Sequence, residues 1–194
     1  VAGIGMSALA RYFMHEGIAV SGYDRDRSAL AIELESEGAE IHYYIDVGKI
    51  PEDVDMVVYT PAIPESHAEL KELRGRGLAV YKRAEVLGML SREKKCIAVA
   101  GTHGKTTTSA MIAFMLRACG VDCTALMGGV VSDFEGNFVY GEGDWMVAEA
   151  DEFDRSFLHL TPQIAVVTSM DPDHLDVYDS CAKMTESYMQ FMRQ

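Results

Sequence analysis

Short apolar runs alternate with amphipathic segments along the whole chain, and this alternation predicts the order of its elements. Near-continuous apolar runs at 96–100, 145–148 and 164–168 predict buried strands, since the strands of a parallel sheet are covered on both faces. Apolar residues at helical spacing predict helices over 84–92 and 109–118. Strands that alternate with helices are typical of an α/β fold.

The first part of the chain shows the same alternation. Helical spacing predicts a helix that ends near Gly17 and another over 28–37. Apolar runs predict strands over 19–23, 40–44 and 56–59. This part therefore also reads as a set of parallel strands joined by helices.

A short charged stretch at 91–95 predicts a linker between two domains. We expect a Rossmann-like parallel-sheet domain over 1–90, followed by a P-loop α/β ATPase domain over 96–194 that is incomplete. The length of 194 residues and the 48% hydrophobic content suit two such domains. The sequence starts inside a glycine motif and stops inside a predicted helix, so we expect it to be a piece of a longer protein.

A glycine-bearing turn that ends in Lys-Thr joins the strand at 96–100 to the helix after it. This is the layout of a phosphate-binding loop, in which glycines let backbone N–H groups approach phosphates and the helix N-terminus adds a favourable dipole. Lys105 supplies a cation for the β- and γ-phosphates, and the Thr106 hydroxyl is suited to Mg²⁺. Val99 stands where the usual pattern has its first glycine. The predicted ATP-binding residues are Gly101, Thr102, His103, Gly104, Lys105, Thr106 and Thr107.

Polar clusters follow the two later strands of this part of the chain. Glu149 comes directly after the strand at 145–148, and His174 lies in an Asp-x-Asp-His-x-Asp cluster after the strand at 164–168. The carboxyl ends of parallel strands share one edge of the sheet, so these two residues and Lys105 are expected there together. A carboxylate beside a P-loop threonine suits Mg²⁺, whereas His174 is equally suited to a second metal, a water or the moving phosphoryl group.

The chain opens on a second glycine loop, Gly3-x-Gly5-x-x-Ala8, with Asp24 about twenty positions on at the end of a predicted strand. This is a dinucleotide-type fingerprint, in which the acidic residue holds a ribose hydroxyl. The strand that should precede the loop is missing from the sequence. Thr60 begins a loop at another strand's carboxyl end, where open parallel sheets bind ligands.

Composition excludes some classes of partner. The net charge of −13 argues against a nucleic acid or an anionic membrane as partner, because both favour a basic face. No apolar run reaches the length of a membrane span. The four cysteines form no C-x-x-C pair, and Cys96 and Cys119 fall in apolar patterns, which indicates buried thiols in a reducing compartment such as the cytoplasm.

Taken together, the motif 101–107, Glu149-Ala-Asp-Glu and Asp173-His-Leu-Asp176 resemble the Mur ligase family of peptidoglycan synthesis, over the whole chain. The opening loop Gly3-Ile-Gly-Met-Ser7 and His103 are most similar to the branch that joins L-alanine to UDP-N-acetylmuramic acid. The resemblance implies an N-terminal domain and about half of a central ATPase domain. The family's C-terminal domain, which grips the amino acid, is not in the sequence.

The resemblance also implies a reaction and a role for each motif. ATP phosphorylates the lactyl carboxylate of the UDP-sugar, and the alanine amine then displaces phosphate from the acyl phosphate. Lys105 would steady the β- and γ-phosphates, Thr106 and Glu149 would hold one Mg²⁺, and His174 would serve a second. Related ligases carry a carbamoylated lysine about four helical turns after that histidine, where this chain has Tyr188. The residues implied for the UDP-sugar are Gly3, Ile4, Gly5, Met6 and Ser7 at the diphosphate, with Asp24 and Thr60 near the uridine.

Three other functions remain open on the sequence. A ligase of the same family that recycles a tripeptide shares most of the later motifs. An NAD-dependent oxidoreductase would account for the first fingerprint but gives no reason for a second loop that carries Lys-Thr. A non-catalytic nucleotide-binding regulator would not need the clusters around Glu149 and His174.

Overall fold

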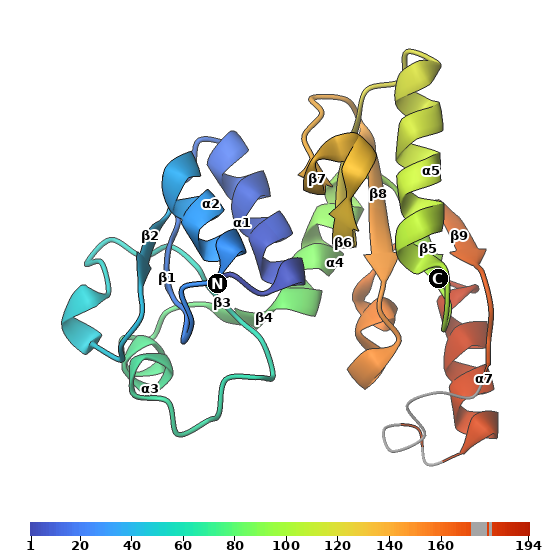
Figure 1. Cartoon of the computed structure of the whole chain (residues 1–194). Coiled ribbons are helices and arrows are strands. Elements are labelled where there is room, and N and C mark those ends of the chain that lie inside the picture. The colour runs from blue at the N-terminus through green and yellow to red at the C-terminus, as the bar shows by residue number, and fades with distance from the viewer. Residues whose placement is uncertain (172–177, 179) are drawn as a thin grey trace. The chain divides into compact units, whose positions relative to one another are not determined.

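A computed structural model describes residues 1–171, 178 and 180–194 of the chain (Figure 1). The chain divides into two compact units, Val1–Val86 and Leu87–Gln194. Both units are α/β structures with parallel strands, as the alternating pattern predicts. None of the helices that the structure describes is long and apolar enough to cross a membrane.

The first unit contains two separate pairs of parallel strands, β1 with β2 and β3 with β4. The expected Rossmann-like sheet would have the strand that leads into the glycine loop between these pairs. Only Val1 and Ala2 precede that loop here, and the amino group of Val1 donates to the carbonyl of Tyr23, 2.8 Å away. The elements of this unit are α1 (Ile4–His15), β1 (Ser21–Tyr23), α2 (Ala29–Glu37), β2 (Glu40–His42), η1 (Val47–Lys49), β3 (Val57–Tyr59), α3 (Ala68–Gly75) and β4 (Val80–Lys82), followed by α4 (Arg83–Glu93), in which the division between the units falls.

Helices α1 and α2 enclose a small apolar core in the first unit. Small and aliphatic side chains from both helices, among them Ala10 and Leu34, pack in this core. Arg11 covers its rim, since its guanidinium pairs with Glu37 at 2.8 Å and with Glu33 at 3.0 Å. The side chain of Ser28 accepts a hydrogen bond from the Ala31 amide, which caps α2 at its start.

The second unit is built on one five-stranded sheet with the order β7-β6-β8-β5-β9. Strands β6, β8, β5 and β9 are parallel, and only β7 runs antiparallel to its neighbour. The carboxyl ends of β8, β5 and β9 therefore meet at one edge of the sheet. The elements of this unit are β5 (Lys95–Ala100), α5 (Lys105–Ala118), β6 (Cys123–Val131), η2 (Ser132–Phe134), β7 (Gly136–Val139), β8 (Trp145–Ala150), η3 (Phe153–His159), β9 (Ile164–Val167) and α7 (Cys181–Phe191).

Three expectations about local structure are wrong. The stretch 91–95 is not a linker: its first residues form the last turn of α4, and β5 begins at Lys95. Ser91 is buried, donates to the Gly88 carbonyl and accepts from the Thr161 amide, which ties this turn into the second unit. The second error concerns the strand at 164–168, which was expected to be buried. Ile164 in β9 is 45% exposed because β9 pairs only with β5 among the described strands. The third error concerns Cys119, which is exposed beyond the end of α5.

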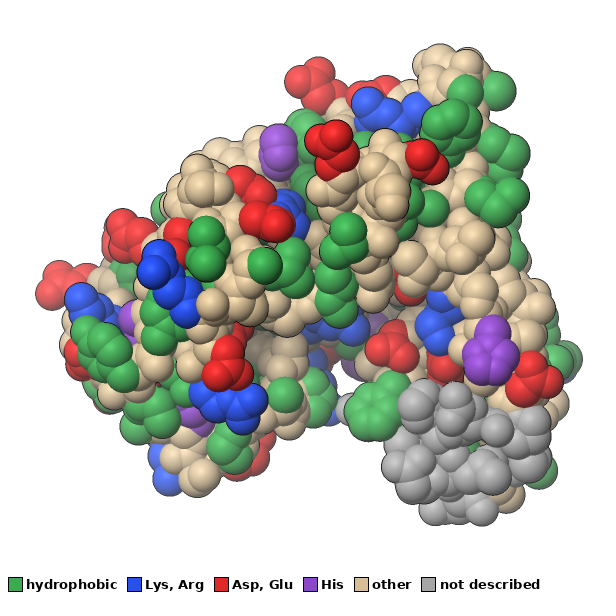
Figure 2. All heavy atoms as spheres, viewed as in Figure 1, with side chains coloured by type: hydrophobic (Ala, Val, Ile, Leu, Met, Phe, Trp, Pro, Cys, Tyr) green, Lys and Arg blue, Asp and Glu red, His purple; other side chains and the backbone are tan. Residues whose placement is uncertain are grey.

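Helix α5 covers the sheet with one face and leaves the other in solvent. Ala113 is fully buried against β6 and β8, in a cluster with Ala125 and Val147. Hydrophobic side chains also lie along the outer face of the helix (Figure 2). The most exposed of these are Met111, Phe114 and Met115. The helix begins at Lys105, four residues before the predicted start, so the Lys-Thr pair lies in its first turn.

Candidate functional site

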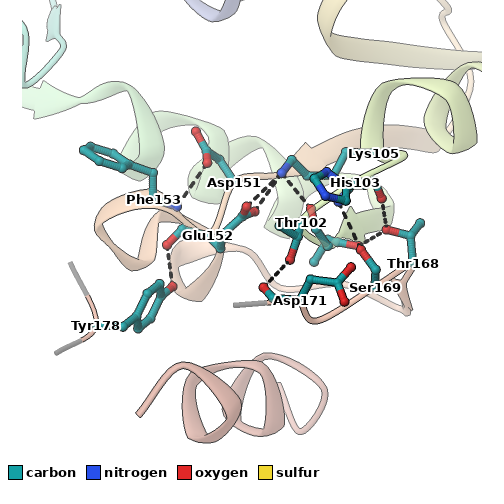
Figure 3. A network of polar contacts seen from close by, with 12 residues as sticks. Thr102, His103, Lys105, Asp151, Glu152, Phe153, Thr168, Ser169, Asp171 and Tyr178 are labelled. Atoms are coloured by element: carbon teal, nitrogen blue, oxygen red, sulfur yellow. Dashed lines mark hydrogen bonds and ion pairs between the residues drawn. The ribbon is translucent and has the colours of Figure 1, made fainter. Parts of the chain in front are cut away.

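The loop between β5 and α5 is held in shape by the residues that follow β9 (Figure 3). The Thr168 hydroxyl donates to the carbonyls of Ala100 and His103, and the His103 amide donates to the Ser169 hydroxyl at 3.0 Å. Gly101 has a φ of 138°, and a Cβ there would lie 2.0 Å from Thr168 Oγ1. Only glycine is compatible with both this backbone and this close approach.

Lys105 is the centre of the polar network in Figure 3. Its ammonium donates to the Gly101 carbonyl at 2.7 Å and to both carboxylate oxygens of Glu152, at 3.0 and 2.8 Å. The Glu152 side chain is only 3% exposed, and the Tyr178 hydroxyl donates to its backbone carbonyl. The sequence alone favours neither a solvated surface role nor a functional role for Glu152. The structure shows that Glu152 is the buried partner of Lys105.

Glu149 and Thr106 both lie against a pair of glycines in β6. The Gly128 amide donates to Glu149 Oε1 at 2.6 Å. A Cβ on Gly128 would lie 2.7 Å from Glu149 Oε2, and one on Gly129 would lie 3.3 Å from Thr106 Cγ2. Sequence reasoning missed this pair, although glycines inside a strand are a sign of a close backbone approach.

These contacts bring a carboxylate and a hydroxyl to the same short stretch of β6, and oxygen donors of this kind suit Mg²⁺. The described residues include no group of three or more His, Cys, Asp or Glu side chains placed to hold a metal ion. His174, the third metal-binding residue predicted from the sequence, lies outside the described residues.

The remaining residues of the predicted nucleotide loop are also tied to the end of β9. The Thr102 amide donates to the Ser169 carbonyl at 3.2 Å, and its hydroxyl donates to the Asp171 carbonyl at 2.9 Å. Thr107 is an exposed residue of the first turns of α5.

Tyr188, from α7, is fully buried with its ring edge-on to Phe157, and burial raises the pKa of its hydroxyl. A neutral phenol therefore occupies this position at neutral pH.

The glycine loop of the first unit forms the start of α1. Gly3 is the N-cap residue, with no side-chain cap and no acidic residue in the first turn. The amide of Ser7 donates to the Gly3 carbonyl at 2.8 Å, and the Ser7 hydroxyl turns back to the Ile4 carbonyl. The predicted residues Ile4, Gly5, Met6 and Ser7 thus lie in the first turns of α1, and none of the residues of its first turn is acidic.

Asp24 lies at the base of this loop. Its carboxylate accepts hydrogen bonds from the Ala2 amide at 2.7 Å and from the Asp26 amide at 3.2 Å. Burial raises the pKa of Asp24, but these hydrogen bonds and the nearby amino terminus outweigh it, and the net effect lowers the pKa. Thr60 follows β3, where its carbonyl accepts from the Ile63 amide. No hydrogen bond described in the structure joins Thr60 to Asp24 or to the loop.

Family models match the chain almost from end to end. The model of the Mur ligase family, catalytic domain, matches residues 1–95, and the model of the Mur ligase middle domain matches residues 99–194. The chain belongs to the Mur ligase family. The resemblance drawn from the loop motifs is therefore confirmed at the level of the family.

Curated relatives have the same name and are about half identical to this chain. The UDP-N-acetylmuramate–L-alanine ligase of Parabacteroides distasonis is 51% identical over 97% of the chain, and that of Cytophaga hutchinsonii is 47% identical over the whole chain. The chain covers 42% and 44% of these two relatives, so it spans less than half of their length.

Solved structures of the family have the same fold. The UDP-N-acetylmuramate–alanine ligase of Thermotoga maritima matches 99% of the chain with a TM-score of 0.89 at 30% identity, and 45% of its own length is covered. A UDP-N-acetylmuramate:L-alanyl-gamma-D-glutamyl-meso-diaminopimelate ligase of Neisseria meningitides matches 98% of the chain with a TM-score of 0.88 at 25% identity, with 65% of its length covered.

Proposed function

We propose that this protein joins L-alanine to UDP-N-acetylmuramic acid with consumption of ATP, as a step in the synthesis of peptidoglycan precursors. The observation that carries the proposal is the identity of about half of all residues, over nearly the whole chain, to relatives named for this reaction. The reaction uses ATP and a nucleotide-linked sugar, and we assign it to the cytoplasm.

The proposed chemistry has two steps. A carboxylate oxygen of the lactyl group attacks the γ-phosphorus of ATP, and ADP leaves with the electrons of the broken P–O bond. The amine of alanine then attacks the acyl carbon, loses a proton and expels inorganic phosphate, which leaves an amide. Phosphoryl transfer of this kind depends mainly on positioning and on neutralising charge.

The contacts at the carboxyl edge of the second sheet support this role. Lys105 is the cation that would meet the β- and γ-phosphates, and the backbone of the loop around Gly101 would cradle them. Thr106 and Glu149 would hold Mg²⁺, which, when bound, neutralises charge on the phosphate oxygens. In the first unit, the loop from Gly3 to Ser7 would take the diphosphate of the UDP-sugar, with Asp24 and Thr60 assigned to the uridine.

Release of phosphate from ATP by the full-length protein tests the proposal. We expect release only when UDP-N-acetylmuramic acid and L-alanine are both present, with formation of the amide in equal amount. Release that needs a tripeptide in place of L-alanine would assign the protein to the tripeptide-recycling alternative instead. Reduction of a nicotinamide cofactor, or nucleotide binding with no turnover, would contradict a ligase.

The metal assignment predicts the effect of two substitutions in the second unit. Glu149→Gln is expected to raise the Mg²⁺ concentration needed for half-maximal activity by about tenfold or more, because an amide is a poorer ligand for a hard cation. Gly128→Ala should act in the same direction, since its Cβ would push against Glu149 Oε2.

The matched control is Gly136→Ala, because the nearest atom to a Cβ at this strand glycine is 3.9 Å away. The measurement is a Mg²⁺ titration of the ligation rate at saturating ATP. An unchanged titration for Glu149→Gln would place that carboxylate outside the metal site.

A further inference from the structure

The threonine that follows β9 is bonded to two separate points of the nucleotide loop in the second unit. The Thr168 hydroxyl shares its proton between the Ala100 carbonyl, 3.2 Å away, and the His103 carbonyl (Figure 3). It fits there because Gly101 has no side chain, since a Cβ on Gly101 would lie 2.0 Å from Thr168 Oγ1. The Thr168 amide also donates to the Ala100 carbonyl, at 3.0 Å. One residue therefore joins the end of β5 to the middle of the loop.

The bond to His103 decides which backbone groups of the loop face an anion. Carbonyl oxygens carry partial negative charge, so a phosphate-binding loop needs its carbonyls turned away and its N–H groups turned inward. The Thr168 hydroxyl holds the His103 carbonyl toward the end of β9. The same planar trans peptide carries the amide of Gly104, which must point the opposite way. The hydroxyl of Thr168 therefore sets the direction of the Gly104 amide.

Two earlier amides of the loop are turned to the residue next to Thr168. The Thr102 amide donates to the Ser169 carbonyl at 3.2 Å, and the His103 amide donates to the Ser169 hydroxyl at 3.0 Å. Gly104 is the N-cap of α5, with a φ of 82°. The first four N–H groups of a helix have no carbonyl of their own helix to bond. The amides that this arrangement offers to a phosphate are thus those from Gly104 onward.

We propose that Thr168 is a positioning residue for the phosphates of ATP. Its hydroxyl holds the His103 carbonyl back and so aims the Gly104 amide, at the start of α5, toward the phosphate chain. Lys105 follows directly and supplies charge, whereas Thr168 supplies geometry and acts through the loop. The inference rests on the proposed function, in which this loop binds ATP.

The first test measures binding of ADP with Mg²⁺ by calorimetry and binding of adenosine by saturation-transfer NMR, both with the full-length protein. Thr168→Val removes the hydroxyl but keeps the shape of the side chain. It is expected to weaken ADP binding by about tenfold, because the backbone donors to the charged phosphates lose their alignment. Thr168→Ser keeps the hydroxyl and should restore the affinity of the parent protein. Adenosine binding should be unchanged in both variants, because adenosine carries no phosphate.

The matched control is Thr161→Val, at an exposed threonine shortly before β9. Thr161 bonds to Ser91 through its backbone amide, so loss of its hydroxyl leaves that bond in place and ADP binding normal. Thr168 is also an exposed residue, so Thr168→Val leaves no cavity in the core. The two valine variants therefore differ in whether the lost hydroxyl is bonded to the loop.

Amide hydrogen exchange of the full-length protein provides a second readout that needs no nucleotide. The amides of Thr102 and His103 are bonded to Ser169, and their protection reports how firmly the loop is held against the end of β9. Thr168→Val is expected to speed exchange in the segment 101–104 by about tenfold, whereas Thr168→Ser and Thr161→Val should leave it unchanged. Exchange in Thr168→Val at the rate of the parent protein would overturn the inference.

The outcomes separate this inference from the proposed function. If the parent protein does not bind ADP, both are wrong. If the parent protein and Thr168→Val bind ADP equally well, the role of Thr168 is wrong and the ligase stands. If Thr168→Ser binds ADP as weakly as Thr168→Val, the hydroxyl is not the cause. If Thr168→Val weakens adenosine as much as ADP, the residue acts on the fold of the whole site. Either of these last two results overturns the positioning role.

Discussion

Lys105→Met is expected to lower the ligation rate of the full-length protein by at least about 100-fold while UDP-sugar binding is retained. The ammonium lies in the first turn of α5 beside the Gly101 carbonyl, where it would meet the charge that develops on the transferred phosphoryl group. The UDP-sugar is assigned to the other unit and does not need this residue. The measurements are the single-turnover rate of amide formation and the dissociation constant of the UDP-sugar.

A loss of folded protein would also lower the rate, and one further variant separates the two causes. Lys105→Met combined with Glu152→Gln removes both charges of the buried pair, so it should recover stability but not activity. The control for lysine loss is Lys95→Met, because the Lys95 ammonium is exposed and lies 3.7 Å from the exposed Asp144 carboxylate and 5.9 Å from the centre of the Trp145 ring. Turnover close to that of the parent protein in Lys105→Met would reject the phosphate-binding assignment.

The second large effect is on stability. Lys105→Met leaves the Glu152 carboxylate buried without its cation, and breaking a buried ion pair in this way costs about 3 kcal/mol of unfolding free energy. The Glu152→Gln double variant should regain most of this loss, because an amide is far less costly to bury than a carboxylate. Lys95→Met should change the unfolding free energy by about 1 kcal/mol or less, since it removes only an exposed ion pair and an exposed cation–π contact with Trp145.

Trp145 is the one tryptophan of these 194 residues and lies in β8, so its fluorescence, measured on the 194-residue chain, reports unfolding of the second unit. Urea unfolding curves followed at this residue give the three free energies. Equal midpoints for the parent protein and Lys105→Met would mean that the contact with Glu152 contributes nothing to the folded state. Failure of the double variant to recover would assign the loss to the side-chain stem of Lys105 rather than to its charge.

Local patterns in the sequence determined the strands and the loop chemistry. The apolar run before Gly101 and the helical spacing after Lys105 were enough to place a glycine turn between β5 and α5. The same reasoning placed Glu149 at the end of β8 and the first glycine loop at the start of α1. These features depend on residues close together in the chain, because turns, caps and helix faces are set by neighbouring side chains.

Tertiary structure alone decided which groups meet. Nothing local indicates that Glu152 is the partner of Lys105 or that Gly128 holds Glu149. Both pairings follow from the strand order, which sets β8 between β6 and β5. Hydrophobic periodicity indicates which segments form strands, but the order of strands depends on which apolar faces pack best together. That choice is made by contacts between residues far apart in the chain, so the sequence pattern supplied the chemical groups and the fold supplied their partners.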